Sequence, residues 1–407
     1  MYQYHTLPNG LRIVHNQIKS PVAHVGVIIN AGSRDELPTE HGLAHFTEHV
    51  FFKGTQKRKL FQVLGRLENI GADLNAFTTK EDISVFASFP KPFYNRTIEL
   101  LSDILFRSVF PAKEIEKEKD VIIDEINAFE DTPAEAIFDD FEDMLFPGNP
   151  LGRNILGRPA ILRKFCRANI LDFTTKHVHP ANMVLCSVGS IGIGRLIEMA
   201  SRYFSQSITP FSPLHREMPA AYESRQDNRK RNVYQAHCII GNRAYNSFDT
   251  QRTAMALLNN ILGGPAMNSR LNMAIREKHG IAYNIESNYS PLSDTGVFSI
   301  YLGTDVSSLE KSIGLVHREL DKLRHGHLGT MQLHTGKRQL TGQLAISMES
   351  HQNDMLSMGK SMLLYDKVEG LQEICQKINN VSAAEIMEAA NLVFAPESLS
   401  MLTFTKK

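Results

Sequence analysis

The sequence predicts an α+β protein made of two homologous α/β domains, each a mainly antiparallel β-sheet flanked by helices. The chain has 407 residues, more than one hydrophobic core accommodates, because single cores stop growing at roughly 250–300 residues. The same order of alternating and helical stretches occurs twice, shifted by roughly 210 residues, which indicates an internal duplication. We expect an N-terminal domain at residues 1–205, a solvated linker at residues 206–231 and a C-terminal domain at residues 232–407.

The N-terminal domain is expected to open with a β-hairpin formed by residues 11–17 and 22–31, which alternate and are rich in β-branched side chains. Amphipathic periodicity predicts the helices that follow, and apolar alternation predicts two more strands. The expected elements are helices at 41–54, 60–70, 93–109, 113–129 and up to 146, a Pro- and Gly-rich loop at 147–158, a further helix, and strands at 83–89 and 182–190.

The C-terminal domain is expected to repeat this order after the polar run at residues 223–231. No aromatic residue is interleaved in that charged run, which disfavours a nucleic-acid patch. The expected elements are strands at 233–242, 280–302 (a strand pair) and 398–404, and helices at 253–262, 308–323, 331–349, 351–364, 371–378 and 383–393.

Composition excludes several classes of function. The 44 basic and 44 acidic side chains cancel, so no overall field favours nucleic acid or an anionic membrane surface. No apolar run approaches the roughly 18 residues that a membrane span needs, and the N-terminus lacks the pattern of a signal peptide. The four cysteines show no Cys-x-x-Cys spacing and are expected to be free thiols in a reducing compartment. We therefore expect a cytoplasmic protein in which the ligands of any metal site are histidines and carboxylates.

The most informative stretch is residues 41–54, which contains His45, Glu48 and His49. On a helix, two histidines four residues apart share one face and can chelate one metal ion, while apolar residues occupy the opposite side. The order His-x-x-Glu-His is the inverted form of a zinc-peptidase motif. The sequence therefore predicts a helix with one buried face and one metal-binding face.

A third ligand is expected on the helix at residues 113–129, where Glu118 and Glu125 lie seven residues apart along an apolar stripe. Carboxylates in such a position need a compensating charge, and a zinc ion provides one. The duplicated half has Gln343 opposite Glu125, and it has Met255, Leu258 and Asn259 opposite the three motif residues. The metal chemistry is therefore expected in the N-terminal domain alone.

Residues 41–55 and 116–125, together with the duplication, resemble the pitrilysin/insulinase family of zinc peptidases, most closely its short members such as the mitochondrial processing peptidases and their bacterial relatives. The resemblance implies one Zn²⁺ per chain, held by His45, His49 and Glu125. Glu125 lies 76 residues after His49, which matches the family spacing. Glu48 would be the general base that takes a proton from zinc-bound water and passes it to the leaving amine. Glu118 has two interpretations, a carboxylate that orients a ligand histidine or a solvated glutamate without a role.

The resemblance also implies where substrate binds. Residues 71–79 resemble the family's edge strand, which pairs with an extended peptide, so Asn75, Ala76 and Phe77 would contact substrate. Phe77 could equally be a core residue. In the C-terminal domain, Arg276 and Tyr283 match a family pair seven residues apart that would bind a substrate carbonyl and the developing oxyanion.

We interpret the chain as a zinc-dependent metalloendopeptidase that cleaves peptides or unfolded segments in an enclosed chamber. Because the chain carries both the zinc motif and the Arg/Tyr pair, the resemblance implies a homodimer in which each site is completed by the partner subunit. A paralogue is a further candidate partner. The alternative function is that of a non-catalytic family member, which serves as a scaffold or assembly subunit.

Two further sets of residues are expected to be structural. Three methionines at helical spacing are expected to fill the core, and two His-x-His pairs are expected to lie on the surface rather than to bind metal. These residues are Met355, Met358 and Met362, and His177, His179, His325 and His327.

Overall fold

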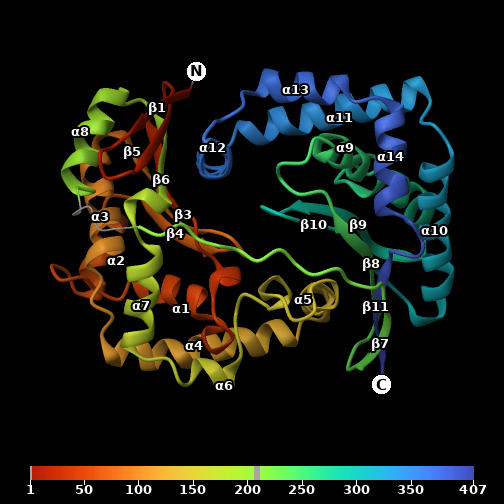
Figure 1. Cartoon of the computed structure of the whole chain (residues 1–407), viewed down its shortest axis with the longest axis horizontal. Coiled ribbons are helices and arrows are strands. Elements are labelled where there is room, and N and C mark those ends of the chain that lie inside the picture. The colour runs from red at the N-terminus through yellow and green to blue at the C-terminus, as the bar shows by residue number, and fades with distance from the viewer. Residues whose placement is uncertain (1, 206–210) are drawn as a thin grey trace. The chain divides into compact units, whose positions relative to one another are not determined.

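The computed structural model describes residues 2–205 and 211–407 (Figure 1). The chain forms two compact units. The first unit comprises Met1–Asn127, Arg153–Arg216 and Ile346–Gly370. The second unit comprises Ala128–Gly152, Glu217–Ala345 and Leu371–Lys407. Residues 128–152 of the N-terminal half thus belong to the second unit, and residues 346–370 of the C-terminal half belong to the first. The predicted division into residues 1–205 and 232–407 does not include this exchange.

The first unit is built on a sheet of six strands among the described residues, in the order β1-β2-β6-β3-β5-β4. Strands β2 and β6 are parallel, and the other neighbours are antiparallel. Every residue of β6 is buried, as expected for a central strand that is covered on both faces. The strands are β1 (Tyr2–Thr6), β2 (Arg12–Gln17), β3 (Val22–Ile29), β4 (Asp73–Thr78), β5 (Ile83–Pro90) and β6 (Met183–Gly189).

The predicted hairpin of β2 and β3 is wrong, although both strands exist. Strand β6 lies between them, pairing with β2 on one side and with β3 on the other. The hairpin of this region is instead β1–β2. The polar turn correctly indicated that two strands follow each other in the chain. It does not show that they pair, because a strand from a distant part of the chain can lie between them.

Helices cover both faces of this sheet. One face carries the main apolar cluster of the unit, to which α1, α3, α4, α7 and α8 contribute. The other face is covered by α12 (His351–Tyr365), which lies against β6, β3 and β2 (Figure 1). Met355, Met358 and Met362 of this helix are buried in the core, as predicted. The helices of the unit are α1 (Leu43–Phe51), α2 (Leu60–Glu68), α3 (Tyr94–Arg107), α4 (Ala112–Glu130, whose last turn belongs to the second unit), α6 (Pro159–Leu162), α7 (Arg167–His177), α8 (Ile193–Tyr203) and α12.

The second unit has a sheet of five strands among its described residues, in the order β7-β11-β8-β10-β9. One face packs on α9, α10 and α14, and α5 packs on the other face beside β8 and β11. The strands are β7 (Gln226–Arg231), β8 (Ala236–Ala244), β9 (Ala282–Pro291), β10 (Gly296–Thr304) and β11 (Ser400–Lys406). The helices are α5 (Pro133–Leu145), α9 (Arg252–Gly263), α10 (Leu309–His325), α11 (Thr330–Met348, which extends into the first unit), α13 (Leu371–Asn380) and α14 (Ala383–Val393).

Part of the predicted linker is a strand. Residues 226–231 form β7, which pairs in parallel with β11 at the edge of the second sheet. An edge strand can be almost wholly polar, so composition alone made this segment resemble a linker. The first residues of the predicted linker, 206–210, lie outside the described part of the chain.

The two sheets confirm the duplication. The order β2-β6-β3-β5-β4 in the first unit corresponds strand for strand to β7-β11-β8-β10-β9 in the second, with the same parallel pair at the same position. The α+β class and the two homologous domains predicted from sequence are therefore present. None of the helices in the described part of the chain combines the length and apolar character that a membrane span requires.

Candidate metal centre

The helix that carries the motif, α1, is fixed at its start by a buried carboxylate. Gly42 precedes the helix at φ +96°, a conformation that favours glycine, and a Cβ there would lie 2.8 Å from the Cα of Gly157. The two oxygens of Glu36 accept the backbone N–H groups of Gly42 (2.9 Å) and Ala44 (2.7 Å). An acceptor at the first turn satisfies N–H groups that the helix itself leaves unpaired. The orientation of α1 is therefore set before the face that carries His45 and His49 begins.

Three side chains from α1 and α4 converge at one point. His45 Nε2 lies 3.9 Å from Glu125 Oε2, and His49 Nε2 lies 3.7 Å from the same oxygen. The two imidazole rings are 4.6 Å apart between centroids. One potential ligand atom from each of the three residues lies within 4.8 Å of the other two. The apolar side of α1 is buried, as predicted, which turns this face toward α4.

The donor set suits zinc. Zinc bonds nitrogen and carboxylate oxygen at about 2.0–2.2 Å, so tetrahedral ligand atoms lie about 3.4 Å apart, close to the distances seen here. Burial lowers the pKa of His45 to about 3, and the neighbouring His49 adds to this, so its imidazole is neutral as a ligand requires. His45, His49 and Glu125 would hold the ion.

Glu118 contacts the outer side of His49. Its Oε2 lies 3.2 Å from His49 Nδ1, and its Oε1 lies 2.6 Å from Lys53 Nζ. A carboxylate can only accept here, so Nδ1 donates to it and Nε2 is the nitrogen that faces Glu125. Burial raises the pKa of Glu118, but the bonds from His49 and Lys53 outweigh it and hold the pKa below its usual value. Glu118 is therefore not a solvated glutamate, and its contact with His49 is compatible with a carboxylate that orients this histidine.

Glu48 lies on the same helix but outside the cluster of ligand atoms. Its Oε2 accepts a hydrogen bond of 2.6 Å from Thr78 Oγ1 at the end of β4. Burial raises the pKa of Glu48, while the bond from Thr78 opposes the rise. A carboxylate with a raised pKa that lies beside the candidate ligands is suited to accept a proton during a reaction.

Strand β4 is the edge of the first sheet, pairing only with β5 among the described strands. Asn75 is exposed, and Ala76 is half-buried on the face that packs toward the main cluster. Phe77 is half-buried on the opposite face, with its ring 5.9 Å from that of Phe86 and 5.1 Å from Lys360 Nζ. An added strand could pair with this edge, where the Ala76 N–H donates to Asn75 Oδ1 at 2.9 Å, and Phe77 packs against side chains of its own unit.

Arg276 and Tyr283 belong to the second unit. Arg276 is exposed in the one-turn π-helix Asn272–Glu277. Tyr283 is 60% exposed near the start of β9, and its hydroxyl lies 3.4 Å from Asp305 Oδ2. Single π-turns are rare and are found frequently at functional sites. Both side chains are accessible to a ligand.

Sequence reasoning missed three residues that contact the candidate site. These are Glu36, Lys53 and Thr78, which bind the start of α1, Glu118 and Glu48 respectively. A signal existed for Lys53 alone, because it follows His49 by four residues and a short extension of the helix places it on the same face. The other two contacts depend on tertiary structure.

Comparison with known proteins gives the family. A family model described as insulinase (peptidase family M16) matches residues 12–158, and one described as the peptidase M16 inactive domain matches residues 164–340. An uncharacterised zinc protease of Bacillus subtilis is 31% identical over 399 residues, which cover 98% of this chain and 97% of the relative. The chain belongs to peptidase family M16.

Further M16 relatives and structures agree with this assignment. An uncharacterised zinc protease of Rickettsia bellii is 31% identical over 97% of this chain and 95% of its own length. The crystal structure of a protease from Helicobacter pylori has a TM-score of 0.92 and 19% identity, and covers 100% of this chain and 99% of that one. A structure from Pseudomonas fluorescens titled as a peptidase M16 inactive domain also has a TM-score of 0.92, at 19% identity. These two structures show that the fold is shared.

The family places this chain among peptidases and hydrolases, and its relatives carry the name zinc protease. The second M16 model bears the description inactive, and it covers the part of the chain in which Met255, Leu258 and Asn259 stand opposite the motif. Met255 and Leu258 are fully buried in the apolar cluster of the second unit. That helix is therefore a packing element.

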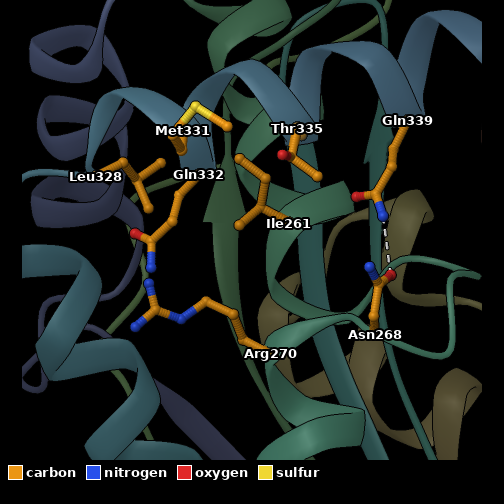
Figure 2. Close-up of a pocket in the computed structure, with 9 residues that line it drawn as sticks. Ile261, Asn268, Arg270, Leu328, Met331, Gln332, Thr335 and Gln339 are labelled. Atoms are coloured by element: carbon orange, nitrogen blue, oxygen red, sulfur yellow. Dashed lines mark hydrogen bonds between the residues drawn. The ribbon is translucent and has the colours of Figure 1, made fainter.

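The second unit of this M16 protein contains a cavity of about 370 Å³, shown in Figure 2. It is formed by α11, the end of α9 and the segment that follows α9. Its single charged lining residue, Arg270, pairs with Glu319 at 3.1 Å, and Gln339 donates to Asn268. The lining offers amide groups and apolar surface rather than a metal-binding or general-base set.

Of the four histidines in the His-x-His pairs, His177 is buried rather than exposed, so the predicted surface location is wrong for that residue, and His179 is half-buried. It lies 4.6 Å from the ring of Phe173 within the first unit. His325 and His327 are exposed as predicted. Burial lowers the pKa of His177 to about 4, and the nearby Lys176 contributes. Its Nδ1 has no hydrogen-bond partner among the described residues.

We expect His177 to make the protein sensitive to acid. Because the pKa falls from 6.5 to about 4 on folding, its stabilising contribution is complete above pH 6.5 and is lost as the pH falls toward 4. Lowering the pH from 7.5 to 5.5 should cost about 1.4 kcal/mol at this site. Urea denaturation of His177→Gln at both pH values should show a smaller loss than the wild type. The exposed control His325→Gln should keep the wild-type loss, and equal losses in all three proteins would contradict the assignment.

Proposed function

We propose that this chain is a zinc-dependent metalloendopeptidase that binds one Zn²⁺ through His45, His49 and Glu125. The observation that supports this function is the convergence of the two Nε2 atoms and one carboxylate oxygen within 4.8 Å, with Glu48 on the same helix. Three protein ligands leave one position of a tetrahedral ion for water or substrate, as in catalytic rather than structural zinc sites.

When bound, zinc would polarise the scissile carbonyl and make a water molecule more acidic. Glu48 takes up the proton that this water releases on attack and later delivers it to the leaving amine. Thr78 holds the Glu48 carboxylate through its hydroxyl. Glu118 orients His49 through its contact with Nδ1, the ring nitrogen that points away from Glu125. Each residue thus has one task at a stated atom.

The substrates are peptides or unfolded segments. An extended chain can add to the edge of β4 beside Asn75, Ala76 and Phe77, where backbone hydrogen bonds would align it without selecting particular side chains. Arg276 and Tyr283 would bind a substrate carbonyl and the charge that develops on it. The exposure of both side chains is compatible with that role.

The function is tested by elemental analysis of zinc together with cleavage of a diverse peptide library, in the presence and absence of a chelator. We expect about one zinc per chain and cleavage that the chelator abolishes. A zinc-replete protein that cleaves no peptide in the library would favour the scaffold function instead. Mapping the cleaved bonds would show whether the enzyme degrades peptides generally or processes a restricted set.

We further propose that the enzyme is a cytoplasmic homodimer that encloses its sites, each completed by Arg276 and Tyr283 of the partner subunit. The proposal is supported by the presence of both residue sets in one chain, in different compact units. Mixing inactive Glu48→Gln and Tyr283→Phe subunits should restore activity, up to about a quarter of the wild-type level if exchange is random and each mixed dimer retains one intact site.

Subunit exchange is checked with two affinity tags on the mixed preparation. Confirmed mixed dimers without recovered activity would argue against a site shared between subunits. Activity that appears only after a paralogue is added would instead identify a heterodimer.

A further inference from the structure

Lys53 forms a short contact that the proposed mechanism does not use. Its Nζ lies 2.6 Å from Glu118 Oε1, and the other oxygen of Glu118 lies 3.2 Å from His49 Nδ1. Both oxygens of one carboxylate are thus bound by two residues four apart in the chain, the second just beyond the end of α1. Lys53, Glu118 and His49 thus form a chain of contacts that leads from an ammonium group to a candidate ligand.

This pair differs from an ordinary surface ion pair. The Glu118 side chain is only 8% exposed, and that of Lys53 is 22% exposed. The comparison is the pair of Lys117 and Glu114 on α4, in which the Lys117 side chain is 55% exposed. Surface pairs contribute little, but removing one partner of a buried pair leaves a charge without compensation. Lys53 therefore both holds the Glu118 carboxylate in position and compensates its negative charge.

The orientation of Glu118 determines that of His49. With Oε1 bound to Lys53, Oε2 is directed at His49 Nδ1, which fixes the ring and presents Nε2 toward Glu125. A carboxylate released from Lys53 can rotate and leave Nδ1 without its acceptor.

The duplicated half gives a second, independent observation. The shifts that place Asn259 opposite His49 and Gln343 opposite Glu125 also place Gly263 opposite Lys53 and Gly336 opposite Glu118. Gly336 packs directly against Ile261, and a Cβ there would lie 2.6 Å from Ile261 Cγ1. The half without the histidines therefore lacks the ammonium group and the carboxylate too, so the three groups differ between the halves as one set.

We propose that Lys53 is a positioning residue of the metal centre, which acts through Glu118 to hold His49 in its ligand orientation. This inference rests on the proposed zinc site. It predicts that Lys53 contributes to zinc affinity without touching the ion, and only while Glu118 is present.

The test measures the zinc Kd by competition with a chromophoric chelator for the full-length protein and for Lys53→Met, Lys53→Arg, Glu118→Gln and the double variant Lys53→Met/Glu118→Gln. Lys53→Met should raise Kd about 10–100-fold, the range for residues that orient a ligand. Lys53→Arg, which keeps the charge, should restore most of the affinity. The control Lys117→Met, which breaks the exposed pair on α4, should bind zinc as the wild type does.

The double variant separates positioning from a general effect. If Lys53 acts through Glu118, Lys53→Met should cause little further loss in the Glu118→Gln background. Independent, multiplying losses would overturn the inference, as would a wild-type Kd in Lys53→Met with only the melting temperature of the zinc-free protein lowered. A wild-type protein that binds no zinc would instead refute the proposed function, so the two failures are distinguishable.

Discussion

Replacing Glu48 with glutamine is expected to lower kcat for peptide hydrolysis by about 10²–10⁴-fold, the usual contribution of a general base. Glutamine keeps the size of the side chain and can still accept the hydrogen bond from Thr78, but it cannot take up a proton. Because Glu48 lies outside the ligand cluster, zinc content and the melting temperature of the loaded protein should stay close to wild type. A loss of turnover without a loss of metal would identify Glu48 as the proton acceptor.

The control for this variant is Glu68→Gln, which removes an exposed carboxylate from the neighbouring helix α2. It should cleave the same peptides at the wild-type rate. Both variants are assayed with zinc measured in the same samples, so that metal loss is not mistaken for lost catalysis. If Glu48→Gln retained more than about a tenth of the wild-type kcat, the proton would have another acceptor.

Local periodicity predicted the features of the site that depend on one helix. The spacing of His45 and His49 fixed their common face, and the apolar residues opposite them fixed which side is buried. The seven-residue separation of Glu118 and Glu125 placed both on one side of α4. The expected apolar surroundings hold for Glu118 alone, because the Glu125 side chain is exposed. The family spacing connected the two helices, and the structure brings Glu125 to both histidines.

Features that depend on the pairing of distant segments were not predictable from single stretches. Strand β6 is inserted between β2 and β3, but several apolar strands have the same alternating pattern of side chains. The pattern alone therefore does not show which strand lies between them. The exchange of α5 and α12 between the units was hidden for a similar reason, since an apolar stripe does not specify which sheet it covers. The duplication contained information that could have identified strand β7. Aligning the two halves strand by strand would have placed residues 226–231 opposite β2 and so predicted a strand there.

The contacts of Glu48 and Glu118 show the same limit at the scale of side chains. Thr78 reaches Glu48 from β4, and Lys53 reaches Glu118 on α4, so each bond joins segments that meet only in the folded protein. His177 is a further example, because its position near the turn at Pro180 suggested a surface location while the fold buries its ring beside Phe173. Sequence identifies reactive groups, and tertiary packing determines their environment.

Replacing Glu125 with glutamine is expected to weaken zinc binding by more than about 10²-fold. Changing a residue that merely orients a ligand costs about 10–100-fold, and Glu125 supplies one of the three candidate ligand atoms. In the wild type, zinc at 100 times its Kd should stabilise the folded protein by about 2.7 kcal/mol, seen as a rise in melting temperature. That rise should disappear in Glu125→Gln at the same zinc concentration, together with peptide cleavage.

The neighbouring residue gives the decisive comparison for Glu125. Asp124 is an exposed carboxylate on the same turn of α4, one position removed from the cluster, so Asp124→Asn changes the charge of the helix as Glu125→Gln does. If coordination is the cause, Asp124→Asn keeps a zinc Kd within about threefold of wild type, since at a distance a surface charge contributes only weakly. Equal weakening in the two variants would show that α4 supplies a negative field and no ligand. Two histidines would then be the only protein ligands, too few for the three-ligand site on which the proposed peptidase depends.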